Sequence, residues 1–237
     1  ELSLLQSHAR QAWQGQGMAV WVSGETGAGK SRLLREFRRW LLEDCAPTAS
    51  VWWVAGEPHH RADPWLPFRQ LLLSILGLTP GSGTESVVQA LGDRGDSATP
   101  ADHADLAAWL SGGESASGRG DDLLAEKALQ WLESYIEAGF AAQPGVLILK
   151  TLHELEQSAC RHLIQRLVQA LPDSHWLLVA SYRSAWDNPH AAIIESHELA
   201  LSALTATECA RLLEQMIGGD EALAGLRQYL LQHAAGN

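Results

Sequence analysis

The residues with the clearest chemical potential lie between Gly24 and Ser31, where the sequence reads Gly-Glu-Thr-Gly-Ala-Gly-Lys-Ser. This spacing, G-x-x-x-x-G-K-S, is typical of a loop whose glycines let backbone N–H groups converge on a phosphate. The Lys30 ammonium can reach the β- and γ-phosphates of a nucleotide, and the Ser31 hydroxyl is placed to ligate Mg²⁺. The pattern therefore predicts a nucleotide-phosphate site. Its expected contact residues are Gly24, Glu25, Thr26, Gly27, Ala28, Gly29, Lys30, Ser31 and Arg32.

The segments on either side of this loop supply the context that such a motif needs. An apolar run predicts a strand over 18–23, and the pattern that begins at Lys30 predicts a helix over 30–43. A helix in this place turns the positive end of its dipole toward a bound phosphate. A glycine-rich turn that binds nothing is the alternative, and the order of strand, loop and helix argues against it.

The rest of the chain alternates apolar runs with helical patterns. Strands are predicted at 51–55, 146–149, 176–180 and 198–201. Helices are predicted at 2–14, 68–76, 121–142, 157–171, 205–217 and 221–234, with shorter ones near 84–91 and 102–110. This alternation favours an α/β domain, a parallel sheet with helices on both faces. Because ligands bind at the carboxyl ends of such strands, the loop 24–31 should meet Lys150 to His153 and Ser181 to Arg183 there.

The composition indicates a globular domain and argues against several classes of partner. The 237 residues are 46% hydrophobic and carry a formal net charge of −11, which makes the chain a poor nucleic-acid binder. The cluster Arg32, Arg35, Arg38 and Arg39 is interpreted as a solvated helix face near the phosphate site. No apolar run approaches the roughly 18 residues of a membrane-spanning helix. Three scattered cysteines indicate a reducing compartment, so we expect a cytoplasmic protein.

The length fits one large α/β domain, or one such domain with a small appendage. Residues 79–120 are the least regular, insertion-like part of the chain, and 111–118 predicts a mobile surface excursion. The sequence starts with Glu1 and stops at Asn237. We therefore expect it to be a piece of a longer protein.

Several motifs together resemble one family. The stretch GETGAGKSRLLREF at 24–37 is similar to the first motif of the AAA-type, Orc1-like P-loop ATPase domains in STAND signal-transduction proteins, which are nucleotide-switch modules of large bacterial regulators. VLILKTLHELEQ at 146–157 and LLVASYRS at 177–184 resemble two further motifs, and the match extends over nearly the whole chain. The resemblance implies a five-stranded sheet of order 5-1-4-3-2, a nucleotide-binding domain over 1–203 and the start of a helical lid over 204–237.

One departure from the family pattern lies at Lys150 and Thr151. The family has two acidic residues here, of which the first orients Mg²⁺ through water and the second polarises the attacking water. Neither a lysine nor a threonine can replace these acids, so Mg²⁺ binding is predicted to be weak. Glu154 or Glu156 could be recruited instead, which leaves open whether the domain is an enzyme. The resemblance further implies that Arg183 is a sensor of the γ-phosphate.

Three functions are compatible with these residues. The first is a regulatory switch that binds ATP or ADP within a larger bacterial signalling or transcription-regulating protein, and that hydrolyses nucleotide weakly or not at all. Its partners would be further copies of itself or linked effector domains, with no direct contact to nucleic acid or membrane. The second is an active ATPase that uses Glu154 or Glu156, and the third is a non-catalytic scaffold. The intact loop argues against the scaffold, and the replaced acids argue against the ATPase. The role of His153 stays undecided between a contact to the metal shell and a cap on the strand end.

Overall fold

The computed structural model describes residues 1–45, 49–57, 63, 65–93, 100–112, 120–135, 143–156, 161–192, 196–217, 225–226 and 229. The helices are α1 (Leu2–Ala12), α2 (Lys30–Trp40), α3 (Leu66–Ile75), α4 (Thr84–Gly92), α5 (Pro100–Leu110), α6 (Asp121–Tyr135), α7 (Leu152–Leu155), α8 (Arg161–Ala170) and α9 (Ala206–Ile217). The strands are β1 (Met18–Gly24), β2 (Ser50–Ala55), β3 (Gly145–Lys150), β4 (Trp176–Ser181) and β5 (Ser196–Leu201). A π-helical turn, η1 (Leu41–Cys45), extends α2.

Most predicted helices and strands are present, with boundaries shifted by a few residues. Helix α7 is not predicted by the periodicity, because its 4 residues are too short to show a repeating pattern. The predicted excursion at 111–118 and the predicted helix at 221–234 lie mostly outside the described residues, as do the end of the helix predicted at 121–142 and the start of the one at 157–171.

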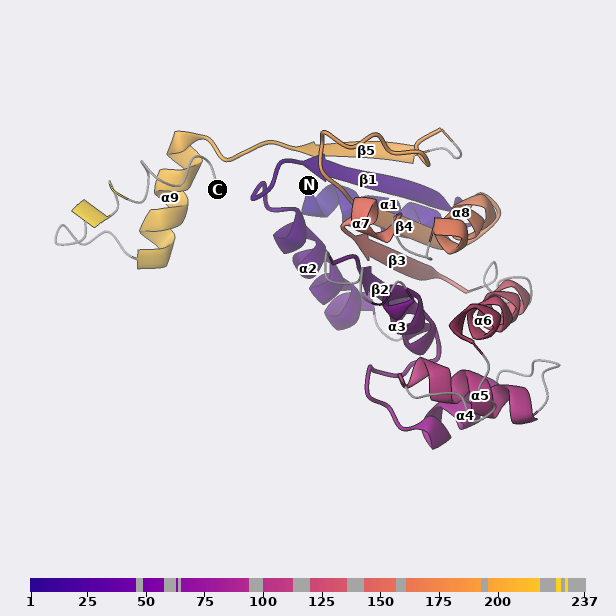
Figure 1. Ribbon diagram of the computed structural model, residues 1–237. Coiled ribbons are helices and arrows are strands. Elements are labelled where there is room, and N and C mark those ends of the chain that lie inside the picture. Colours follow the sequence, from indigo (N-terminus) through magenta and orange to yellow (C-terminus); the bar gives the residue numbers. More distant parts are fainter. Residues whose placement is uncertain are drawn as a thin grey trace.

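The five strands form a parallel sheet in the order β2-β3-β4-β1-β5, which confirms the predicted α/β fold and strand order (Figure 1). Strand β1 lies between β4 and β5, where Val20 is opposite Val179 on one side and His197 on the other. Every residue of β1 is buried. A strand covered on both faces has no solvent-facing side, and for this reason its sequence is an unbroken apolar run before Ser23.

Helices cover both faces of the sheet and create two apolar cores. On one face, Leu5 of α1 and Phe37 of α2 pack with alternate strand residues such as Val20. On the other face, residues of helices α3 to α8 form one core with the intervening strand residues, which include Trp21 and Trp52, and α4 and α5 pack on the other helices of this layer. Consecutive residues of a strand enter different cores because their side chains point to opposite faces. The two layers leave the carboxyl ends of the strands open for a ligand.

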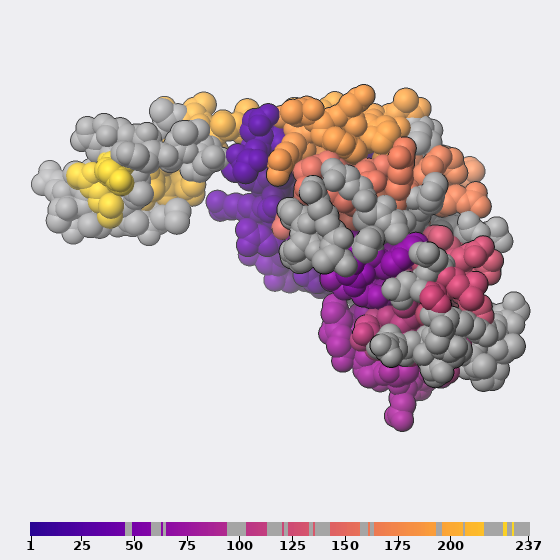
Figure 2. Space-filling model, in the orientation of Figure 1, coloured from indigo at the N-terminus to yellow at the C-terminus, as the bar shows by residue number. Residues whose placement is uncertain are grey.

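The chain leaves the sheet after β5 and continues into α9, which is set off from the body of the molecule (Figures 1 and 2). A capping box starts this helix: the Thr205 hydroxyl accepts the Glu208 backbone N–H at 3.3 Å, and the Glu208 carboxylate accepts the Thr205 N–H at 2.8 Å. The predicted division into a nucleotide-binding domain and a lid at residue 204 stays a prediction. No helix among the described residues combines the length and apolar character needed to cross a bilayer.

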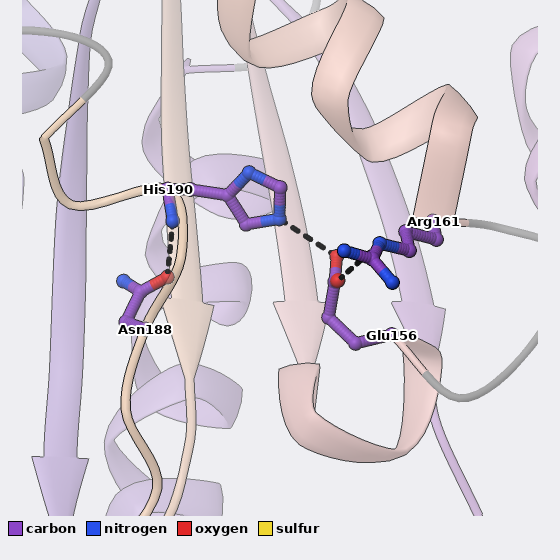
Figure 3. A network of polar contacts seen from close by, with 4 residues as sticks. All are labelled: Glu156, Arg161, Asn188 and His190. Atoms are coloured by element: carbon purple, nitrogen blue, oxygen red, sulfur yellow. Dashed lines mark hydrogen bonds and ion pairs between the residues drawn. The ribbon is translucent and has the colours of Figure 1, made fainter.

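A polar network with a buried pair at its centre connects α7 and α8 to the loop between β4 and β5 (Figure 3). His190 Nε2 lies 2.7 Å from Glu156 Oε1, and these two side chains are 4% and 8% exposed. Arg161 Nε, at the start of α8, lies 3.6 Å from the other carboxylate oxygen. The Asn188 side-chain oxygen accepts the His190 backbone N–H at 3.0 Å. Because buried polar groups need partners, this network fixes the loop 182–192 against the end of α7.

The network leads to a stability prediction. Glu156→Ala removes the partner of a buried imidazole and should lower the free energy of unfolding by about 2 kcal/mol. The matched control is Glu36→Ala, because Glu36 pairs with Arg39 at the exposed surface of α2, and surface ion pairs contribute only about 0–1 kcal/mol. Urea denaturation followed by tryptophan fluorescence measures both variants. Equal losses would show that the contact between Glu156 and His190 does not stabilise the fold.

Candidate nucleotide-binding site

The predicted phosphate loop connects the carboxyl end of β1 to the start of α2 (Figure 1). Gly27 and Gly29 have φ values of 89° and 90°, in the left-handed region that residues with a side chain resist. The Gly29 carbonyl accepts the N–H groups of Arg32 and Leu33, both at 2.9 Å, and so begins the helix. The loop therefore ends on a helix N-terminus, where free N–H groups and the helix dipole favour an anion.

A cavity of about 370 Å³ lies against this loop. Its walls come from the loop, the start of α2, and the residues at the ends of β3 and β4. The cationic side chains in the lining are Lys30, Arg32, Arg35 and Arg183, and no acidic residue is among the described residues that line it. Such a lining attracts an anion as highly charged as a polyphosphate and repels a free metal cation.

The residues predicted to contact phosphate divide into three groups. Those that line the cavity are Thr26, Gly27, Gly29, Lys30, Ser31 and Arg32. Gly24 and Glu25 present their backbone carbonyls to Lys30, and the Glu25 carboxylate also accepts a hydrogen bond from the Ser184 hydroxyl. Ala28 faces a second cavity on the other side of the loop. The predicted sensor, Arg183, lines the first cavity.

The Lys30 ammonium is held by the backbone of its own loop. Its Nζ donates to the carbonyl oxygens of Gly24 and Glu25 at 2.6 and 2.7 Å. Burial lowers the pKa of this ammonium, the Glu25 carboxylate opposes that shift, and the Arg183 guanidinium adds to it. Arg183 thus disfavours the charged lysine, and a phosphate bound between the two cations would relieve their repulsion.

Two hydrogen bonds bring the ends of β3 and β4 toward the loop. The Thr151 N–H donates to Ser181 Oγ at 3.2 Å, and the Tyr182 N–H donates to the Val22 carbonyl at 3.0 Å. Thr151 has φ 62° and ψ 55°, a left-handed conformation that a β-branched residue rarely adopts. Such strain persists only where the surroundings fix the backbone, and it is typical of functional sites.

The Glu198 carboxylate of β5 anchors the residue that precedes Arg183. Glu198 Oε1 accepts from Ser23 Oγ at 3.0 Å and from the Tyr182 hydroxyl at 3.2 Å. Burial, followed by the Glu198 charge, raises the pKa of Tyr182 to about 12. The phenol therefore keeps its proton at neutral pH and stays a hydrogen-bond donor, which holds the end of β4 beside β5.

The four arginines of α2 are exposed, in agreement with the predicted solvated face near the phosphate site, and Arg35 lies where that face meets the cavity. Its side chain lines the cavity, and its Nε donates to the Ser31 carbonyl at 3.2 Å. The position one helical turn after Ser31 is the sequence signal that locates it, since residues i and i+4 lie on the same face of a helix. Arg38 lies outside the cavity, with its guanidinium 5.6 Å from the centroid of the Trp53 ring.

The two glutamates proposed as substitute acids are not among the described residues that line the cavity. The Glu156 carboxylate faces His190 and Arg161 instead (Figure 3). Glu154 Oε1 lies 4.0 Å from Nε2 of His153, which does line the cavity. A catalytic role for Glu156 therefore stays a prediction, and the contacts of its carboxylate direct it away from the loop.

A second cavity, of about 310 Å³, adjoins the first through Gly29 and Arg32, which line both. Leu33 lines it from α2, and Leu2 lines it from α1. The opposite wall is the segment from Leu201 to Leu204, which leads from β5 toward α9. The cationic cavity thus continues into a space with several apolar walls.

The side-chain oxygens that the described cavity lining offers a nucleotide-bound Mg²⁺ are hydroxyls, among them the predicted ligand Ser31, and none is a carboxylate. Magnesium sites in proteins usually add one or two carboxylates to the phosphate oxygens. In the part of the chain that the structure describes, no group of three or more His, Cys, Asp or Glu side chains is arranged to hold a metal. The lining residues therefore fit the phosphates better than they fit the metal.

Comparisons with solved structures show the same fold. The Drosophila ORC bound to DNA aligns with a TM-score of 0.61 and 16% identity, over 99% of this chain and 49% of that chain. The ORC1 protein of Aeropyrum pernix in complex with DNA aligns with a TM-score of 0.55 and 14% identity, over 98% of this chain and 54% of that chain. The chain thus spans about half the length of these proteins, and at such identities the likeness shows the fold alone.

Comparison with family models is more specific. No curated protein sequence matches the chain. The model of the AAA ATPase domain matches residues 1–180, a range that runs from α1 through the phosphate loop into β4. Since this range covers most of the chain, the protein belongs to the AAA ATPase domain family.

Proposed function

We propose that this domain is a nucleotide-binding switch module of a larger bacterial signalling or transcription-regulating protein of the STAND type, in which ATP or ADP binds at the loop and hydrolysis is weak or absent. The observation that carries the proposal is the cavity, in which a glycine-rich loop and a set of cations face one space without an acidic residue among the described lining. This combination favours phosphate binding and offers no carboxylate to activate water. We attribute the weak or absent hydrolysis to Lys150 and Thr151, which stand where the family has two acidic residues.

In this proposal the second cavity holds the nucleoside part of the ligand. Its apolar residues, Leu2, Leu33 and Leu204, suit the face of a base, and its shared wall at Gly29 and Arg32 places it next to the phosphates. The same cavity is lined by Glu208 of α9. A nucleotide that fills both cavities would contact the sheet domain and α9 together, and would thereby favour one position of α9. The identity of the base follows only from the family and stays a prediction.

The expected partners remain part of the proposal. The two solved relatives are complexes of other proteins with DNA. This chain carries a net charge of −11, and the arginines of α2 that line the cavity would be engaged by nucleotide phosphate. We therefore propose self-association or linked effector domains as partners, in the cytoplasm and without direct contact to nucleic acid.

Nucleotide binding should depend on Lys30. Lys30→Ala removes a charge-assisted contact to phosphate, which contributes about 1.5–3 kcal/mol, so ATP affinity should fall about ten- to a hundredfold. Arg38→Ala is the matched control, because this cation lies on the same helix but over the Trp53 ring. Isothermal titration calorimetry measures both variants. If Lys30→Ala binds ATP as tightly as the parent, the loop is not the binding site.

Intrinsic ATP hydrolysis should be far slower than about 1 s⁻¹, the lower end of ordinary enzymes. The physical reason is the loss of charged positioning groups, which costs about 10²–10⁴ in rate. Installing Asp at position 150 and Glu at position 151 together should raise phosphate release, and the same pair in a Lys30→Ala background should not. A parent rate near 1 s⁻¹ that disappears in Lys30→Ala and in Glu154→Gln would instead support an active ATPase.

ATP binding should tolerate removal of Mg²⁺. Lys150 is not among the described residues that line the cavity, but its neighbour Thr151 is, and Leu149 before it is opposite Ala180 of β4. Two cations about 4 Å apart repel by about 4 kcal/mol at an effective dielectric constant near 20, and the same ammonium attracts phosphate. Titrations with ATP in excess EDTA, followed by calorimetry or by tryptophan fluorescence, should therefore show binding by the parent, whereas Lys150→Asp should require Mg²⁺. Loss of parent binding in EDTA would show that Lys150 does not substitute for the metal.

A further inference from the structure

His153 has hydrogen-bonding capacity that no described residue uses. It is 8% exposed, and both ring nitrogens are shielded and lack a hydrogen-bond partner among the described residues. The nearest carboxylate oxygen, Glu154 Oε1, lies 4.0 Å from Nε2, beyond hydrogen-bond range. A neutral imidazole carries one N–H, so this ring holds a buried donor without an acceptor. Such groups are costly and rare in native structures, and they call for an explanation.

The position of the ring indicates which ligand would complete its bonding. His153 lines the cationic cavity together with Arg183, and the Trp186 ring lies on another side with its centroid 6.2 Å away. His153 follows β3 and Arg183 follows β4, whereas the phosphate loop follows β1. A phosphate chain held by the loop amides therefore extends its outer group toward the ends of the neighbouring strands. That outer group is the one a diphosphate lacks.

We propose that His153 binds the terminal phosphate of a nucleoside triphosphate: the ring turns one N–H onto a γ-phosphate oxygen and takes up a proton from solvent as it does so. The inference rests on the proposed function, because it requires nucleotide in the loop cavity. It adds a residue that distinguishes triphosphate from diphosphate, and it makes the switch sensitive to pH.

The charges around the ring determine the direction of this pH dependence. Burial lowers the pKa of His153, as do Arg183 from the loop after β4 and Lys30 from α2, while Glu154 on the same short helix opposes them. A phosphate oxygen against the ring favours the imidazolium and raises the pKa in the complex. Binding therefore takes up a proton at pH values between the free and bound pKa. Affinity for triphosphate consequently increases as the pH falls through that window.

The test is calorimetric titration of the domain with the non-hydrolysable analogue AMP-PNP and with ADP at several pH values, in buffers of different ionisation enthalpy. The parent should take up a proton with AMP-PNP and little with ADP. His153→Gln keeps an N–H donor that does not titrate, so it should bind AMP-PNP nearly as tightly as the parent at pH 8 and show no such uptake. Relative to this variant, the parent should gain about tenfold in affinity between pH 8 and pH 6. Because nucleotide phosphates also titrate near pH 6, the two proteins are compared at the same pH.

Two further variants complete the design. His153→Leu should weaken AMP-PNP about ten- to a hundredfold at pH 6 and leave ADP nearly unchanged. His175→Gln is the control, because His175 directly precedes β4 and so lies at the opposite end of the strands from the cavity, and it should match the parent. The imidazole NMR resonance of His153, assigned by its absence in His153→Gln, should titrate at higher pH with AMP-PNP than without it.

The outcomes separate this inference from the proposed function. If the parent binds neither nucleotide, the proposed function fails, and the inference fails with it. If the parent binds AMP-PNP but His153→Gln shows the same proton uptake and pH dependence, the inference alone is wrong. Should His153→Leu fail to fold, the comparison of His153→Gln with the parent still decides.

Discussion

The gathering of positive charge at one edge of an acidic protein is the constraint on which the rest of the site depends. The chain has a net charge of −11, yet Lys30, Arg32, Arg35 and Arg183 line a single cavity. Like charges that share one cavity repel one another, and no acidic residue is among the described residues that line it. The fold must hold these groups in place, and an anionic ligand would supply a countercharge.

The strand ends carry the polar contacts that hold this edge together. Ser181 accepts the N–H of Thr151, Tyr182 donates to Glu198, and Glu156 faces His190 at the far end of the segment that carries Arg183. Each contact joins residues from different strands or from the loops that follow them. The predicted sensor, Arg183, therefore lies in a segment that is attached to the sheet at both ends, and Thr151, in its left-handed conformation, lies at the same place.

The two adjoining cavities are the feature through which the proposed switch would couple nucleotide binding to α9. They meet at Gly29 and Arg32, and the second one is lined both by α1 and by the chain that leads to α9. A ligand can shift an equilibrium between conformations only through contacts that differ between them. Such a difference would arise at the segment from Leu201 to Leu204, which lines the second cavity and leads to α9. The helix itself is set off from the body of the molecule (Figure 2).

Much of this protein was determined by local sequence patterns. The predicted phosphate loop can be located from the sequence because its glycines, Lys30 and Ser31 lie within one short segment. Their spacing alone specifies the turn and the start of the helix. The strands are readable because burial on both faces requires unbroken apolar runs. The alternation of strand and helix patterns also predicts the parallel α/β class. The strand order was predicted only from the family resemblance, because the sequence of a strand does not show which distant strand it pairs with.

The tertiary structure decided how the remaining polar residues are used. Arg35 belongs to a run of arginines that look alike in the sequence, and only the packing of α2 on the sheet separates it from Arg38. His153 lies in α7 and Glu156 directly follows this helix, yet their side chains have different surroundings. Glu156 contacts His190 from the loop after β4, whereas His153 is buried in the wall of the cavity. A side chain's role depends on what lies opposite it, and for these residues the opposite group comes from another strand end. The sequence by itself therefore determined the phosphate loop and the sheet, and the convergence of the strand ends decided which side chains meet there.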